Sequence, residues 1–190
     1  KDSTAVKVTY RFPQTDARWD ITYKVYSNGV IKVNNHFVAE NAQAPMIPRV
    51  GLRMQLPARI TSLAYYGRGP EENYRDRRTS QFFGEYTSDI KDMYEPYVRP
   101  QENNHRTDIY WCTLTSKAKE GLLFVADRTF EMNVSNYPLE SLDSGDSIEN
   151  GAPRTAKTNH RHLTDPQAVP SVDFFIDYRM MGIGGDNSWG

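Results

Sequence analysis

The sequence predicts an all-β protein, a large antiparallel β-sandwich, and three observations carry this prediction. Tyrosine, phenylalanine, valine and threonine are interleaved along much of the chain, which is the composition of half-buried strands. Several short segments alternate apolar and polar residues, and turn signals separate these segments. No long segment has the periodicity of an amphipathic helix.

The bulk composition excludes several classes of protein. Of the 190 residues, 38% are hydrophobic and 25% are charged, which is enough apolar material for a folded core. The net charge is -1 without a basic block, so nucleic acid is a poor candidate partner. No run of about 18 apolar residues occurs, so we expect no membrane span. We expect residues 1–190 to form a single β-sandwich domain. Because the chain begins with Lys1 and not with methionine, has no signal-like segment after it and stops abruptly at Gly190, we expect a fragment of a larger protein.

The first strong strand signal is a hairpin. Apolar and polar residues alternate from Trp19 to Val25, which predicts one buried face and one solvated face. A two-residue loop would place Val25 opposite Lys32 and mix the two faces. A three-residue loop with Gly29 in the left-handed region places Val25 opposite Ile31, so this bulged hairpin is the prediction.

The other elements follow from shorter patterns. Further strands are expected at 50–56, 59–66, 109–115, 121–127, 130–137 and 171–180. A short helix is expected near 138–142, and the polar stretch 141–159 is expected to be a long surface loop. Cys112 lies in one of these strands, so we expect a small buried filler and not a nucleophile.

The segment "YYGRGPEENYRDR" (65–77) crowds charge beside a turn that its glycines and proline force. Its carboxylates could face a sugar or a partner, or they could form a salt-bridged corner that fixes the loop. Charged clusters are usually structural or solvated. For any single carboxylate in this segment, the salt-bridged corner is therefore the favoured interpretation.

The segment "YEPYVRPQENNHR" (94–106) combines prolines, which hold an extended path, with planar and hydrogen-bonding side chains. These side chains are of the types that bind carbohydrate: Tyr94, Tyr97, Arg99, Gln101, Glu102 and Asn103. The alternative is a long connection between sheets, and the sequence leaves both interpretations open.

His160 and His162 lie two residues apart, so on a strand they would share one face, as a metal pair would. No cysteine is near them and no third ligand is evident, so hydrogen-bonding histidines are the better interpretation. We therefore place no metal in this chain.

The chain closes with "MGIGGDNSWG" (181–190), in which the glycines permit backbone shapes that other residues avoid. Trp189 then stands on a loop and not in a strand. Its flat apolar face suits the C–H face of a sugar ring. The alternative is a tryptophan that folds back onto the sandwich.

These segments occur in a characteristic order. They are "PRVGL" (48–52), "GRGPEENYRDR" (67–77), "DMYEPYVRPQENN" (92–104), "HRHL" (160–163) and "MGIGGDNSW" (181–189). In this order the chain resembles the C-terminal domain of the glycoside hydrolase family 2 β-galactosidases of bacteria. The resemblance covers roughly residue 48 to the end, and residues 1–47 match only as a strand pattern.

The resemblance implies a sandwich similar to that of the galactose mutarotases, at the end of a multidomain chain. It also implies retaining hydrolysis of terminal β-galactosides such as lactose, which needs two carboxylates about 5–5.5 Å apart. In the family both are glutamates of a central TIM-barrel domain, which this chain lacks. We therefore expect no catalytic residue here and no hydrolysis by this chain alone.

The resemblance implies that Trp189 binds substrate by offering a stacking surface to the leaving-group sugar. Candidate sugar or interface contacts are Asp186, Tyr97, Arg99, Glu102 and Asn103. The family uses magnesium and sodium or potassium, with the main ligands in the barrel domain, so we expect no cofactor on this chain. Expected partners are the β-galactoside, the TIM-barrel and other domains of the same chain, and further copies in a homo-oligomer. The expected compartment is the bacterial cytoplasm or periplasm.

Two other functions stay open. One is an autonomous carbohydrate-binding module, which would use Tyr94, Tyr97, Arg99 and Glu102. The other is mutarotase-like chemistry, which needs a histidine and a carboxylate in one pocket. The candidates for it are His36 or His160 with Glu71 or Glu102.

Overall fold

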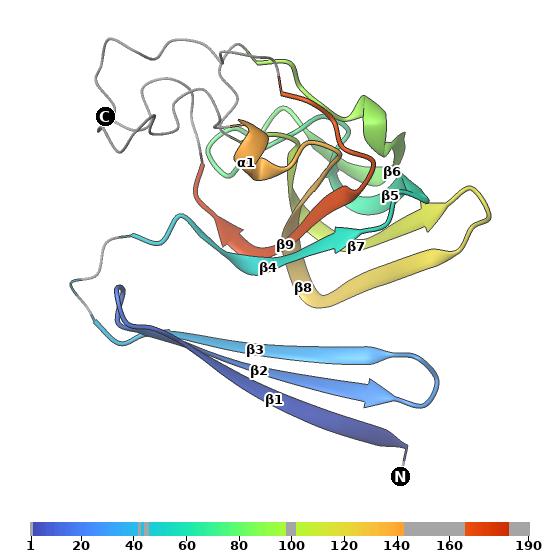
Figure 1. Cartoon of the computed structure of the whole chain (residues 1–190). Helices are drawn as coiled ribbons and strands as arrows, with labels where there is room; N and C mark the ends of the chain where they lie inside the picture. The colour runs from blue at the N-terminus through green and yellow to red at the C-terminus, as the bar shows by residue number, and fades with distance from the viewer. Residues whose placement is uncertain (1, 42, 44–45, 98–101, 143–165, 183–190) are drawn as a thin grey trace. The chain divides into compact units, whose positions relative to one another are not determined.

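The computed structural model describes residues 2–41, 43, 46–97, 102–142 and 166–182 (Figure 1). Within them the protein is nearly all strand, with two antiparallel sheets and two short helices, η1 (Ile90–Asp92) and α1 (Leu139–Leu142). The all-β class is confirmed, and the two sheets are consistent with the predicted β-sandwich. Neither helix is long and apolar enough to cross a membrane.

The chain divides into two compact units, Lys1–Ile47 and Pro48–Gly190, and each unit holds one sheet. The two units are described separately below. The single domain over residues 1–190 stays a prediction.

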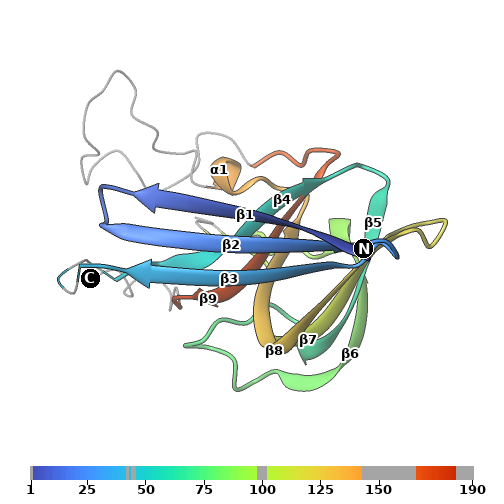
Figure 2. The ribbon, with the colours of Figure 1, turned by 90° about the horizontal axis from the view of Figure 1, so that it is seen from below.

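The first unit is an antiparallel sheet in the order β1-β2-β3. Its strands are β1 (Ser3–Phe12), β2 (Ala17–Tyr26) and β3 (Ile31–Ala39), which lie side by side in Figures 1 and 2. Val25 pairs with Ile31, and Gly29 has a φ of 87°. The predicted bulged hairpin is therefore confirmed. β1 was not predicted from the sequence.

Alternation along β2 gives this sheet one apolar face. Ile21 is buried on it, and the Trp19 ring lies 6.5 Å from that of Tyr10 and 6.3 Å from that of Phe37. Asp20 points to the other face, where it accepts a hydrogen bond of 2.7 Å from the Thr9 hydroxyl.

The second unit is an antiparallel sheet in the order β4-β9-β8-β7-β5-β6. Its strands are β4 (Arg49–Leu56), β5 (Ile60–Gly69), β6 (Phe82–Asp89), β7 (His105–Ser116), β8 (Gly121–Ser135) and β9 (Val172–Met180). The predicted strands at 50–56, 59–66, 109–115 and 171–180 are confirmed as β4, β5, β7 and β9. The short helix near 138–142 is confirmed as α1.

The prediction of two strands at 121–127 and 130–137 was wrong, because they form one continuous strand, β8. The polar pair Asp127 and Arg128 lies at the boundary between the two predicted segments. In the structure the pairing of β8 with β7 continues past this point through register shifts, so the strand is irregular but not interrupted. β6 was not predicted either.

One face of the second sheet carries the apolar core. Phe174 on β9 and Phe124 on β8 pack with ring centroids 4.9 Å apart. Cys112 is fully buried in this core, which confirms it as a buried filler. The fully buried members of the cluster are Ile109, Cys112, Leu114, Met132, Val172 and Phe174. The opposite face of β8 and β9 is polar, and the buried polar residues of the candidate site lie on it.

Candidate functional site

Two segments that the sequence singled out, 65–77 and 94–106, bind to each other in the second unit. The backbone N–H of Asn73 donates to the carbonyl of His105 over 2.8 Å. The Asn73 side chain is fully buried; its amide nitrogen donates to the carbonyls of Arg68 and Glu71, each over 3.1 Å. Its oxygen accepts from the backbone N–H of Thr107 at 3.0 Å and from the hydroxyl at 2.6 Å. Asn73 thus uses its full hydrogen-bonding capacity to hold the two segments together.

Glu72, a neighbour of Asn73, is a buried carboxylate with several donors. Its Oε2 accepts from the backbone N–H of Asn104 at 2.7 Å and from the Tyr74 hydroxyl at 3.3 Å. Its Oε1 is bound by the Arg77 guanidinium and by the Tyr97 hydroxyl. The environment of Glu72 therefore agrees with the favoured interpretation of segment 65–77, in which its carboxylates form a salt-bridged corner.

Two predicted sugar-binding tyrosines are described: Tyr94, whose ring stacks on Tyr137 with centroids 4.0 Å apart, and Tyr97. The ring of Tyr97 is partly exposed, while its hydroxyl binds Glu72 and Arg77. Burial, followed by the hydrogen bond to Glu72, raises the pKa of Tyr97 above its ordinary value. The exposed ring could stack on a sugar, but its polar end is already engaged within the protein.

Glu102 and Asn103 are buried in hydrogen bonds of the protein itself. Glu102 lies 3.2 Å from the Arg49 guanidinium and also binds the amide nitrogen of Asn133. The Asn103 side chain donates to the carbonyl of Glu95 at 2.7 Å and accepts from its N–H at 3.0 Å. The predicted sugar or interface contacts of both residues stay a prediction. The other predicted residues, Arg99, Asp186 and Trp189, lie outside the described residues, as do Gln101, His160 and His162.

The structure also brings together a buried polar cluster that sequence reasoning missed. His105 at the start of β7 has Nδ1 2.7 Å from Asn133 Oδ1 and Nε2 3.2 Å from Glu131 Oε2. Its ring stacks on Tyr74, with centroids 5.2 Å apart. Glu131 and Asn133 occupy alternate positions of β8, and both are buried. The signal that could have found the cluster is the run of amides and a histidine at 103–105.

Glu131 is 1% exposed and has partners on both oxygens. Oε1 lies 2.6 Å from Arg75 Nε, and Oε2 accepts from the backbone N–H of Met180 at 2.9 Å. Burial by itself raises the pKa of Glu131. The hydrogen bonds from His105 and Met180 and the charge of Arg75 outweigh burial, so the pKa lies below its ordinary value.

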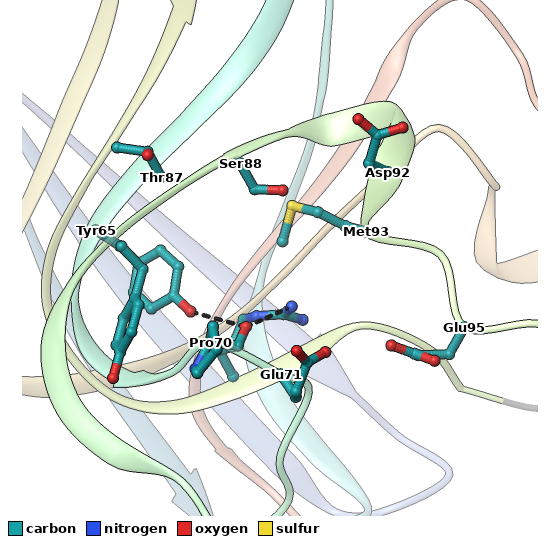
Figure 3. A pocket seen from close by; sticks show the side chains of 10 residues that line it. Tyr65, Pro70, Glu71, Thr87, Ser88, Asp92, Met93 and Glu95 are labelled. Atoms are coloured by element: carbon teal, nitrogen blue, oxygen red, sulfur yellow. Dashed lines mark hydrogen bonds between the residues drawn. The ribbon is translucent and has the colours of Figure 1, made fainter.

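A small pocket lies beside these segments, with a cavity volume of about 170 Å³ (Figure 3). Its lining includes three carboxylates, from Glu71, Asp92 and Glu95, and the buried Arg106. Burial, followed by the charges of neighbouring glutamates, raises the pKa of Glu95. The dashed lines in Figure 3 end on the carbonyl of Pro70, which accepts hydrogen bonds from Tyr65 at 3.2 Å and Arg106 at 3.0 Å. A cavity of this size and polarity suits only a small polar ligand.

Of the candidate residues for mutarotase chemistry, the structure describes His36, Glu71 and Glu102, and His160 lies outside the described residues. His36 lies exposed on β3 of the first unit, opposite Asp20. Glu71 lines the pocket of the second unit, and Glu102 is buried beside Arg49. Among the described residues, no group of three or more histidine, cysteine, aspartate or glutamate side chains could hold a metal ion.

Comparison with known proteins identifies the family. The family model of the β-galactosidase small chain matches residues 1–190. The chain is 31% identical to a β-galactosidase of Priestia megaterium, over 99% of this chain and 17% of that protein. It is 33% identical to a β-galactosidase of Lactobacillus delbrueckii subsp. bulgaricus, over 100% of this chain and 17% of that protein. The chain therefore spans about one sixth of the length of these relatives, and it belongs to the β-galactosidase small-chain family.

Proposed function

We propose that this chain is one domain of a β-galactosidase and that it supplies Trp189 to an active site built mainly by other domains. The observation that carries the proposal is the match over the whole chain to a small part of proteins named β-galactosidase. The whole protein would hydrolyse terminal β-galactosides such as lactose. Its other domains, the substrate and further copies of the same chain would be the partners of this domain.

The chemistry of the described carboxylates supports a domain that does not cleave the bond itself. A retaining glycosidase needs two carboxylates about 5–5.5 Å apart on either side of the substrate. Glu72, Glu102 and Glu131 are buried, and each is bound by arginine. A buried, paired carboxylate cannot reach a sugar. These three are therefore poor candidates for catalysis, and from the family resemblance we propose that the catalytic glutamates, and the ligands for magnesium and sodium or potassium, lie in the rest of the enzyme.

The role of Trp189 is to bind and orient the leaving-group sugar. Residues 181–190 follow β9 directly, and the three glycines at 182, 184 and 185 suit an extended loop. An aromatic face stacked on a sugar ring raises affinity and orients the substrate without taking part in bond cleavage. For the whole enzyme we propose a bacterial cytoplasmic or periplasmic location.

The test is Trp189→Ala in the full-length enzyme, with lactose as substrate. A lost stacking contact of about 1.4 kcal/mol lowers affinity about tenfold, so we expect KM for lactose to rise by about that factor. Trp189→Phe keeps an aromatic face and serves as the matched control, with a smaller rise. Unchanged turnover and KM for lactose in Trp189→Ala would contradict the proposal.

A second candidate function is autonomous binding of a small sugar, which the pocket around Arg106 favours. Glu71, Asp92 and Glu95 line this pocket and supply acceptors for the hydroxyl groups of a polyhydroxylated ligand. Calorimetric titration of the isolated chain with galactose and lactose tests it. Binding near 1 mM, about -4 kcal/mol, would support this function, and no heat at high millimolar sugar would contradict it.

A further inference from the structure

The loop that joins β2 to β3 in the first unit carries an Asn28–Gly29 pair at its tip (Figure 1). The loop residues 27–30 are all exposed. Gly29 is in the left-handed region, and none of the described residues lies within 4 Å of the position that a Cβ atom would take there. The backbone nitrogen of Gly29 is therefore not shielded by a side chain of its own or of a neighbouring segment.

The Asn28 side chain is bent over the peptide bond that precedes Gly29. Its Oδ1 accepts a hydrogen bond of 3.2 Å from the backbone N–H of Val30. An asparagine that accepts from the N–H two residues further on directs its side chain towards the C-terminal end of the turn, as in an Asx turn. Cγ of Asn28 therefore lies on the side of the Gly29 nitrogen, and the hydrogen bond draws electron density away from this carbon.

One hydrogen bond opposes a reaction between these two atoms. The N–H of Gly29 donates to the carbonyl of Tyr26 over 3.1 Å, which closes the turn. The nitrogen can attack only after this bond has opened and its proton has been lost to a base. Backbone hydrogen bonds at an exposed loop tip open at a low cost in free energy, so the bond slows the reaction without preventing it.

We propose that Asn28 is a site of spontaneous covalent modification, where the folded chain deamidates with water as the co-reactant. The Gly29 nitrogen loses its proton to a base and forms a bond to Cγ of Asn28. The bond from Cγ to Nδ2 breaks, and ammonia leaves with a proton returned by the base. The product is a five-membered succinimide. Water then adds to one of the two ring carbonyls and opens the ring, which gives aspartate or isoaspartate at position 28.

The two products affect the hairpin differently. Aspartate keeps the acceptor for the N–H of Val30. Isoaspartate runs the main chain through the side-chain carbon, so it adds one atom to the loop. The pairing of Val25 with Ile31 depends on the length of this loop, so isoaspartate should weaken the first sheet. Either product makes the net charge of the chain one unit more negative.

The experiment incubates the folded chain in ¹⁸O-labelled water near pH 8 and maps its peptides by mass. We expect the peptide with Asn28 to gain about 3 Da, since ammonia leaves and one labelled oxygen enters. Asn34 and Asn35 are internal controls, because they pair with Thr22 and Ile21 in the ladder and precede residues that have side chains. They should react at least about tenfold more slowly. The sequence has a second Asn–Gly pair at 150–151, outside the described residues, and mapping assigns it to another peptide.

A synthetic peptide of residues 25–32 supplies the rate for a chain without the sheet. The folded chain should react within about tenfold of this peptide. A folded chain that reacts more slowly than that, or that converts Asn34 and Asn35 as fast as Asn28, would overturn the proposal. Asn28→Gln is the matched variant, since its longer side chain disfavours ring closure, and it should gain no mass at position 28.

Freshly prepared Asn28→Asp separates the effect of isoaspartate from that of the new charge. It carries the aspartate product alone, so its Tm should be close to that of the unreacted chain. A chain that has been incubated until Asn28 is consumed should have a lower Tm than Asn28→Asp, because it also contains isoaspartate. Equal Tm values would show that the longer main chain does not weaken the first sheet.

Discussion

Arg49 Nε lies 3.1 Å from Asp177 Oδ2, so a buried ion pair joins β4 and β9 in addition to their backbone ladder. Asp177 is fully buried, and neither of its oxygens has a hydrogen-bond partner among the described residues. The register shift between Val50 and Gly51 lies beside it, and a Cβ on Gly51 would be 2.0 Å from Asp177 Oδ1. The glycine of "PRVGL" is thus required by the close approach of this carboxylate.

The pH dependence of stability follows from Asp177. Burial raises its pKa from 3.8 to about 7, although the charges of Arg49 and His105 act in the opposite direction. Between these two values the folded chain holds a proton that the unfolded chain has lost. The free energy of unfolding therefore rises as the pH falls from about 7 towards 4. Above about pH 7, burial of the ionised Asp177 lowers the free energy of unfolding by a constant amount.

Asp177→Asn mimics the protonated carboxyl and should remove this dependence. Relative to the variant, the original chain should gain up to about 1.4 kcal/mol in the free energy of unfolding per pH unit lowered below 7. Denaturant unfolding of both chains at several pH values between about 5 and 7.5 measures the difference. Parallel curves would show that Asp177 is ionised in the folded chain over this range.

Cys112 should be inert towards thiol reagents in the folded chain. It is fully buried, and burial raises the pKa of its thiol far above the ordinary value, so the reactive thiolate is absent and inaccessible. We expect no reaction with a disulfide reagent near pH 8 and complete reaction in denaturant. Rapid modification of the native chain would mean that β7 opens readily.

Phe174→Ala should be among the most destabilising core substitutions in the second unit. The ring is fully buried and packs on Phe124, so its removal leaves a cavity in the apolar core of the second unit. Phenylalanine-to-alanine changes in cores cost about 3–5 kcal/mol. Tyr178→Ala, on the same strand but 69% exposed, is the control and should cost within about 0.5 kcal/mol. Equal midpoints for the two variants in denaturant unfolding would contradict this assignment of the core.

The first hairpin shows how far local sequence can predict structure. The alternation from Trp19 to Val25 and the left-handed preference of Gly29 are properties of neighbouring residues, and together they predicted the observed pairing of Val25 with Ile31. β6 was missed for a complementary reason. Phe82 and Phe83 are consecutive residues at the start of an edge strand and both are exposed, so alternation was weak there.

The sequence by itself determined the all-β class, most strands of the second sheet, the register of the first hairpin and the burial of Cys112. Each of these depends on the order of apolar and polar residues along a short segment. Only the tertiary structure shows that the side chains of Glu131 and Asp177 are buried, because alternation alone assigns these polar positions to solvent. Whether a polar side chain meets water or a buried partner depends on which distant segment covers it. Here Arg75 and His105 bind Glu131 of β8, and β4 brings Arg49 to Asp177.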